Sequence, residues 1–263
     1  MNQISECSLG REMKDMGKDG EYLGSRVFRV MFLLGFLLAG CFEPNAGLNF
    51  ASKREKDVET ASVIELTQNH KDLDLKTKES LQRYGETIQS YAYNYQVDWR
   101  LVLAVMKQES QFRAKAVSYR GAYGLMQIMP LTEAELTQKI GVRNARSPHN
   151  NIKAGIFHLM TLYRFFEKAR GDERVRLTLA AYNAGLSRVQ DAQDVAEYLG
   201  DDPNAWKGVR DALQLLSRHY KTFHRNVWND GTPRAGYFKD WRQTTNYVES
   251  IMSYYDEYQL ALR

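Results

Sequence analysis

Cysteine is nearly absent from this sequence: only Cys7 and Cys41 occur among its 263 residues. Both lie near the N-terminus, so the rest of the chain offers neither a disulfide nor a cysteine-based metal framework. We therefore expect a fold held together by packing alone, with no metal and no other cofactor. Structural or surface roles are expected for the histidines, since no ligand spacing with carboxylates is found for His149, His158, His219 or His224.

A strong charge of one sign is also missing. The formal net charge is +4 at pH 7, and no run of lysine and arginine is dense enough to indicate a nucleic-acid-binding face. We expect no nucleic-acid partner. Hydrophobic residues make up 43% of the chain and charged residues 26%, as in ordinary globular proteins, so a buried core is expected.

The apolar run Val30–Ala39 is too short to span a bilayer, which requires roughly 20 residues. Arg26 and Arg29 precede it and Gly40 follows it, which is typical of a secretory signal. The segment Leu38-Ala-Gly-Cys41 resembles the bacterial lipobox, in which the cysteine is acylated and becomes the new N-terminus. The expected partner of the N-terminal end is thus a membrane, bound through the lipid on Cys41.

Three segments are predicted along the chain. Residues 1–40 form a lipoprotein signal peptide, residues 41–76 a lipid-anchored flexible tether, and residues 77–263 the folded domain. The tether is predicted because its sequence is polar, charged and without sustained periodicity. Phe42, rather than the Asp that resembles an inner-membrane retention signal, follows Cys41. We therefore expect an anchor in the outer membrane, facing the periplasm, with the inner membrane as the alternative. The protein is expected to be a monomer.

Helical periodicity predominates from about residue 78 onward. An amphipathic stripe with 3-4-3-4 spacing is formed by Leu81, Tyr84, Ile88, Tyr91 and Tyr95. Asp98 is the predicted N-cap of a helix from Trp99 to about Gln111, and Glu109 falls near the end of this helix, beside its apolar face.

Further helices are predicted down to the C-terminus. The pattern indicates a short helix between Gly124 and Pro130, then one over 133–140 that begins with a capping box of Thr132 and Glu135. Later helices open at Asn151, near 173 with Gly185 as C-cap, at Ser187, and over 204–221 and 245–260, whereas 224–241 is predicted to be irregular. Neither a convincing strand pattern nor an internal repeat is found, so the predicted fold class is all-α.

Three short segments carry the candidate chemistry: Glu109-Ser110, Gly124-Leu-Met-Gln-Ile-Met-Pro130 and Ala181-Tyr-Asn-Ala-Gly185. They supply one carboxylic acid on a helix, a turn with an amide and thioethers, and a Tyr-Asn pair. Apolar surroundings raise the pKa of a Glu because they disfavour its charged form. This equipment suits protonation of a glycosidic oxygen and does not suit metal, phosphate or nucleotide chemistry.

These segments, together with Asn151-Ile-x-x-Gly155 and Asn246-Tyr-Val248, closely resemble the catalytic domain of soluble lytic transglycosylases over about residues 78–260. The stretch from Trp206 to Asp256 resembles the membrane-bound F-type branch more specifically. The resemblance implies a compact helical domain of the α+β lysozyme-like superfamily with a substrate cleft. It also implies a peptidoglycan lytic transglycosylase that cleaves the MurNAc-β-1,4-GlcNAc bond of glycan strands.

The resemblance also assigns roles to individual residues. Glu109 would protonate the leaving oxygen and then, as a carboxylate, take the proton of the sugar's own 6-hydroxyl. Tyr182 would hydrogen-bond Glu109, with Asn183 beside it, and Tyr247 would close the cleft from the last helix. The sites for the peptide and N-acetyl groups would be lined by Ser118, Gln127 and Met129. This sequence departs from the family pattern at Tyr119, usually Pro, and at Thr244-Thr245, where a Glu is often seen.

A single carboxylate favours one reaction over another. Ordinary glycosidases use two carboxyl groups, and no second Asp or Glu lies near the other two segments in a position typical of such a group. Intramolecular attack, which leaves a 1,6-anhydro-MurNAc end, is therefore predicted. The alternatives are a hydrolytic muramidase of goose-lysozyme type and a wall-binding lipoprotein that has lost activity.

Overall fold

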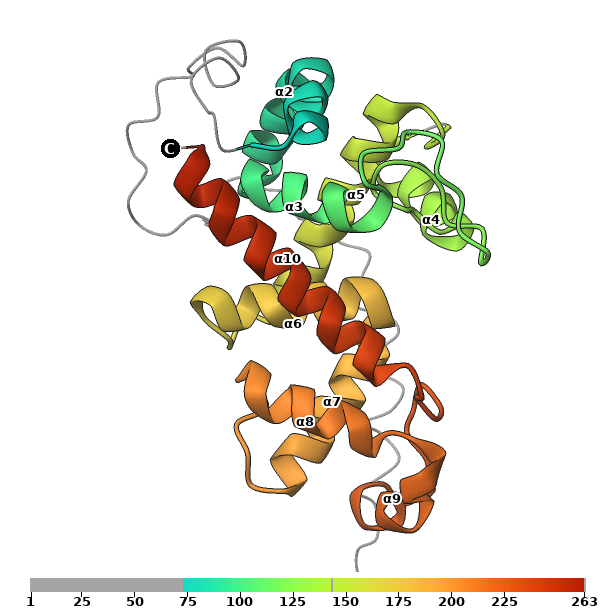
Figure 1. Ribbon diagram of the computed structural model, residues 1–263. Coiled ribbons are helices and arrows are strands. Elements are labelled where there is room, and N and C mark those ends of the chain that lie inside the picture. The colour runs from blue at the N-terminus through green and yellow to red at the C-terminus, as the bar shows by residue number, and fades with distance from the viewer. Residues whose placement is uncertain (1–72, 143, 263) are drawn as a thin grey trace, which may run out of the picture. The chain divides into compact units, whose positions relative to one another are not determined.

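The computed structural model describes residues 73–142 and 144–262 (Figure 1). The predicted signal peptide 1–40, the predicted acylation site Cys41 and the predicted tether up to residue 72 lie outside the described residues. Within the described ranges the chain is helical, and its only β-pairing consists of isolated bridges. The predicted all-α class is therefore confirmed.

The described helices span most of the domain. None of them is both long and apolar enough to cross a membrane. In chain order they are α2 (Leu75–Tyr95), α3 (Trp99–Ser110), α4 (Pro130–Ile140), α5 (Pro148–Phe165), α6 (Gly171–Ala184), α7 (Leu186–Tyr198), α8 (Trp206–Leu215), the 3-10 helix η1 (Arg218–Tyr220), α9 (Lys221–Val227) and α10 (Trp241–Ala261).

The first two described helices match the predicted helical pattern, although α2 begins at Leu75, inside the segment 41–76 predicted as a tether. The Asp74 side chain caps α2 by accepting a hydrogen bond from the Thr77 amide at 3.0 Å. Asp98 caps α3 as predicted, accepting from the Arg100 amide at 2.9 Å. The apolar stripe of α2 is buried at Leu81, Tyr84 and Ile88, whereas Tyr91 and Tyr95 are half-buried and pack against the core.

The short helix predicted before Pro130 is absent. Residues 117–128 form turns and two antiparallel bridges instead, with Tyr123 and Ile128 exchanging both backbone hydrogen bonds at 3.0 Å. A helix is excluded here because Gly124 and Gln127 have φ angles of +82° and +47°, in the left-handed region. The predicted capping box of Thr132 is also wrong, because α4 already begins at Pro130, a residue favoured in the first helical position.

Other predicted boundaries shift for similar reasons. Ser147, not Asn151, caps α5, and its side chain accepts from the Asn150 amide at 3.3 Å. Ser187 lies inside α7, which begins directly after Gly185, the C-cap of α6 as predicted. The single helix predicted over 204–221 is broken by the turn at 216–217, and α9 continues to residue 227 inside the segment predicted as irregular.

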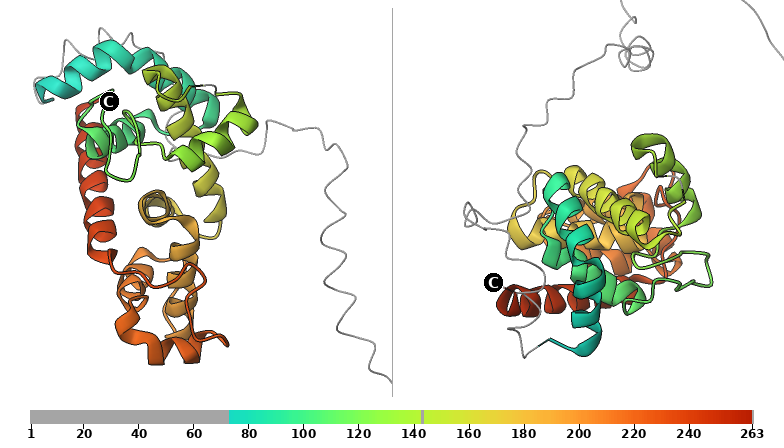
Figure 2. Two further views of the ribbon diagram at one scale, coloured as in Figure 1. Left: turned by 90° about the vertical axis from the view of Figure 1, so that its right-hand side faces the viewer. Right: turned by 90° about the horizontal axis from the view of Figure 1, so that it is seen from above.

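Helix α10 connects the parts of the fold that carry the candidate site. It contacts α3, α6 and α8. Its first turns lie near α7 and α8, and its C-terminal end lies near α2 and α3 (Figures 1 and 2). Two phenol–carboxylate hydrogen bonds join it to α3. Tyr255 donates to Asp98 at the start of α3 at 2.8 Å, and Tyr247 donates to Glu109 at its end at 2.6 Å. The two helices are therefore antiparallel, pinned over about 16 Å of α3 and about 12 Å of α10 at the usual helical rise.

Candidate active site

Glu109 lies in the last turn of α3, where the helix leaves the core. Val105 and Met106, about one turn earlier, are fully buried, whereas Glu109 itself is half-buried. Burial of its carboxyl raises the pKa of Glu109 from 4.5 to about 7, and the hydrogen bond from Tyr247 lowers it only in part. The group is thus a carboxylic acid that holds its proton near neutral pH while remaining in reach of solvent.

The phenol that holds Glu109 comes from α10. Tyr247 is buried, and its hydroxyl donates to Glu109 Oε1 at 2.6 Å. Burial and the nearby Glu109 charge raise the pKa of Tyr247 well above 10, so the phenol keeps its proton. The sequence resemblance implied this bond from Tyr182 and a cleft-closing position for Tyr247. In the structure Tyr247, and not Tyr182, makes the hydrogen bond to Glu109.

Tyr182 holds a backbone turn instead of the carboxylate. Its hydroxyl donates to the Met126 carbonyl oxygen at 2.8 Å. Burial raises the pKa of Tyr182 well above 10, and the charge of Glu109 raises it further. The ring on α6 is therefore within electrostatic reach of Glu109, and it faces the same site without bonding the acid.

The turn at 124–127 is fastened to α3 and α5 by side chains. Ser110, the neighbour of Glu109, is buried and donates to the Leu125 carbonyl oxygen at 2.9 Å. Asn151 on α5 accepts from the Met126 amide at 2.8 Å. Only glycine fits at position 124, because a Cβ there would lie 2.6 Å from the Asn151 amide group. The end of α3 and the turn are therefore held as one unit.

The three residues expected to line the substrate site have different surroundings. The Ser118 hydroxyl accepts from the Ala122 amide at 3.0 Å and closes a tight turn. The Gln127 Nε2 group donates to two carbonyl oxygens of the same loop, at 3.1 and 2.9 Å. Met129 is 38% exposed, at the N-cap of α4. Ser118 and Gln127 thus also hold the shape of the loop on which Met129 is presented.

Asn183 is fixed by Thr244, a residue whose partner is not evident from the sequence. The buried Thr244 hydroxyl donates to Asn183 Oδ1 at 2.8 Å. Thr244 lies three residues before Tyr247, so both face the same side of α10. The sequence alone shows that Thr244 and Tyr247 share one face of a helix. It does not show that their partners are Asn183 and Glu109, because tertiary packing decides this.

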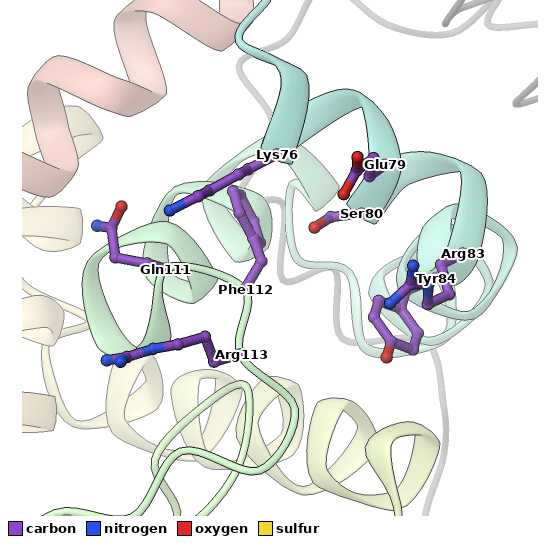
Figure 3. A pocket seen from close by; sticks show the side chains of 8 residues that line it. All are labelled: Lys76, Glu79, Ser80, Arg83, Tyr84, Gln111, Phe112 and Arg113. Carbon is purple, nitrogen blue, oxygen red and sulfur yellow. The ribbon is translucent and has the colours of Figure 1, made fainter.

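The predicted substrate cleft around Glu109 stays a prediction. One surface pocket, of about 200 Å³, lies between α2 and the segment that follows α3 (Figure 3). Its lining includes Lys76, Arg83 and Arg113, but neither it nor a second pocket beside α2 includes Glu109 or Tyr247. Over residues 73–142 and 144–262, no three acidic, histidine or cysteine side chains are grouped as a metal site requires.

Comparison with known proteins defines the class of domain. Residues 86–204 match the family model described as Transglycosylase SLT domain, and this stretch contains Glu109, the 124–130 segment and Tyr182. The chain therefore carries a domain of the SLT family, which confirms the resemblance found in the sequence.

Individual relatives point to one branch. The chain is 35% identical over 178 residues to a membrane-bound lytic murein transglycosylase F of Desulfosudis oleivorans, covering 67% of this chain and 36% of that protein. It is 36% identical over 176 residues to a membrane-bound lytic murein transglycosylase F 1 of Alkalilimnicola ehrlichii, covering 66% and 33%. The chain thus spans about a third of the length of these relatives.

Solved structures give a weaker likeness. The 70 kDa soluble lytic transglycosylase of Escherichia coli is 24% identical, with a TM-score of 0.45, over 67% of this chain and 24% of that one. A likeness at this level bears no functional argument.

Substitution of Tyr247 by Phe is expected to raise the pKa of Glu109 above about 7. The phenol stabilises the carboxylate, so its removal leaves only the opposing effect of burial. A ¹³C NMR titration of the Glu109 carboxyl measures the shift. The control is Tyr255→Phe, which removes the other phenol–carboxylate bond between α10 and α3 and leaves the Glu109 titration in place. A lowered pKa in Tyr247→Phe contradicts this assignment.

The raised pKa of Glu109 also predicts a pH-dependent loss of stability. Between pH 4.5 and about 7 the folded chain keeps a proton that the unfolded chain has released. The free energy of unfolding therefore falls as the pH rises through this window, and then levels off. Replacement by Gln removes the effect, so Glu109→Gln should gain about 1–3 kcal/mol over the parent protein at pH 8 and almost nothing at pH 4. Urea unfolding at the two pH values measures this, and an equal difference at both refutes it.

Proposed function

We propose that this protein is a peptidoglycan lytic transglycosylase that cleaves the MurNAc-β-1,4-GlcNAc bond and leaves a 1,6-anhydro-MurNAc end. The observation that carries the proposal is the half-buried Glu109, whose pKa is raised to about 7 and whose carboxyl accepts the Tyr247 hydrogen bond. The SLT-family match over residues 86–204 supports the substrate class, since the curated relatives are named lytic murein transglycosylases.

Glu109 would act first as an acid and then as a base. A general acid is most effective when its pKa lies near the working pH, because it is then both protonated and able to give up its proton. Transfer of the Glu109 proton to the glycosidic oxygen breaks the bond to C1 of MurNAc and leaves a carboxylate. Tyr247 stabilises that carboxylate through its hydrogen bond. The carboxylate then takes the proton of the C6 hydroxyl as this oxygen bonds to C1, which closes the anhydro ring and restores the acid.

The surroundings of Glu109 favour this route over hydrolysis. Burial and the Tyr247 hydrogen bond account for its pKa shift, and no Asp or Glu of the described segments contributes to it. An inverting hydrolase needs a second carboxyl group to activate water, and a retaining one needs it as the nucleophile. A lone acid/base suits attack by the sugar's own hydroxyl, which requires neither.

Digestion of purified peptidoglycan tests the reaction and its product together. The expected products are muropeptides with anhydro ends, which mass spectrometry distinguishes because they lack one water. Glu109→Gln should reduce the rate by at least about 10²–10⁴-fold, the contribution typical of a general acid. Glu135→Gln, a change of the same kind at an exposed position on α4, serves as control and should keep full activity.

Two results contradict the proposal. Products that carry only reducing ends indicate a hydrolytic muramidase, and they overturn the lyase reaction while leaving Glu109 as the acid. Unchanged activity in Glu109→Gln removes Glu109 from the reaction altogether.

We further propose that Cys41 anchors the protein to the outer membrane, from which the domain reaches the wall on the periplasmic side. The support is the lipobox-like segment Leu38–Cys41 and the words "membrane-bound" in the names of the curated relatives. Phe42 favours the outer over the inner membrane, because an Asp at its position would resemble an inner-membrane retention signal.

A Cys41→Ser variant is expected to leave the membrane fraction when the full chain is produced in a bacterium, because the acylated side chain is lost. Cys7→Ser is the matched control and should stay with the membranes. Sucrose-gradient fractionation with immunodetection measures both. Continued membrane association of Cys41→Ser would refute the anchor.

A further inference from the structure

His158 lies on the face of α5 that is turned toward the 124–127 turn and Tyr182. Asn151, Gly155 and His158 follow one another at four- and three-residue spacing, so they share one side of the helix. Asn151 accepts from the Met126 amide, and a Cβ at Gly155 would lie 2.6 Å from the Met126 side chain. One turn further on, the His158 ring packs on Tyr182, with ring centroids 5.2 Å apart and planes tilted by 53°.

The contacts of Tyr182 connect His158 with the acid. Tyr182 bonds the Met126 carbonyl oxygen, and its phenol senses the charge of Glu109. The imidazole is thus in direct contact with a ring that borders the proposed catalytic group. This packing is compatible with the structural or surface role expected for His158 from the sequence.

The ring nitrogens of His158 have no hydrogen-bond partner among residues 73–142 and 144–262, yet neither is a buried unsatisfied atom. The buried side-chain atoms that lack a partner in this part of the chain are Arg188 Nε and His224 Nδ1. The half-buried His158 ring thus keeps part of its surface exposed to solvent. His224 is the opposite case, because it is fully buried and its Nε2 bonds the Leu215 carbonyl at 2.6 Å.

The imidazole is uncharged in its surroundings. Burial lowers the pKa of His158 to about 4, and the charge of Lys139 on α4 adds to this effect. At neutral pH the ring thus offers one N–H donor and one nitrogen acceptor. Such a group matches a hydroxyl or an acetamido group, whereas a carboxylate or phosphate is better matched by a cation.

We propose that His158, beside Tyr182, binds an uncharged hydroxyl or acetamido group of the glycan strand and so helps to seat the sugar next to Glu109. The proposal rests on the proposed function, because it takes the peptidoglycan glycan as the ligand. It adds a residue of α5 to the candidate site residues, which otherwise come from α3, the loop, α6 and α10.

Equilibrium binding separates this contact from catalysis. Glycan strands freed of stem peptides by an amidase are titrated calorimetrically into Glu109→Gln protein and into the same protein carrying a second change. His158→Phe keeps a ring against Tyr182 and removes the hydrogen bond, so the Kd should rise about 3–10-fold, the effect of one neutral hydrogen bond. His158→Gln restores a donor and an acceptor and should recover part of the affinity.

His149→Phe is the matched control. His149 lies on the same helix and makes an edge-on contact with Tyr84, at 6.1 Å between ring centroids. The same change there should leave the Kd unaltered. Unfolding by heat, followed for each variant, shows whether the ring exchange disturbs the fold.

The proposal is overturned by an unchanged Kd in His158→Phe or by no recovery in His158→Gln. It is also overturned if the loss of affinity is confined to strands that keep their stem peptides, because the contact is then to peptide. Absence of any binding to the Glu109→Gln protein also overturns it. The reaction itself is judged separately, from the products of the parent protein. If His158→Phe weakens binding while the parent protein yields no products, the His158 contact is supported and the transglycosylase reaction is refuted.

Discussion

The hydrogen bond from Tyr247 to Glu109, made where α3 emerges from the core, is the interaction on which the site depends. Two opposing effects act on the same carboxyl group. Burial favours the protonated form, and the phenol favours the charged form. Burial prevails, since the rise in pKa from 4.5 to about 7 corresponds to about 3 kcal/mol in favour of the proton. The phenol keeps this preference from growing further, which leaves an acid that can also release its proton.

The rest of the fold holds this pair and the facing turn in fixed positions. Antiparallel packing of α10 on α3 sets the phenol against the acid, and the Tyr255–Asp98 hydrogen bond is a second contact between the two helices at their other end. Ser110, next to the acid, binds the Leu125 carbonyl oxygen and so fixes the 124–127 turn relative to Glu109. The loop is therefore held both by burial of Leu125, Met126 and Ile128 and by side chains that bond its backbone polar groups.

The sequence was most informative where local patterns decide the structure. The capping of α3 by Asp98, the buried stripe of α2 and the place of Glu109 at the end of an apolar helix follow from spacing and residue type. It failed where distant segments compete for one partner. Tyr182 and Tyr247 are both phenols near the acid, and only the packing of α10 on α3 decides which of them bonds it. The helix expected before Pro130 failed because left-handed residues and backbone pairing outweigh the local apolar pattern.

The most direct test of the central claim is the protonation state of Glu109 in the unaltered protein. Infrared absorption of its carboxyl group, taken as the difference from Glu109→Gln across a pH titration, reports that state without any assay of activity. We predict a protonated carboxyl band that persists to near neutral pH and disappears with an apparent pKa of about 7. A band that is lost between pH 4 and 5, as for a Glu in open water, would contradict the account.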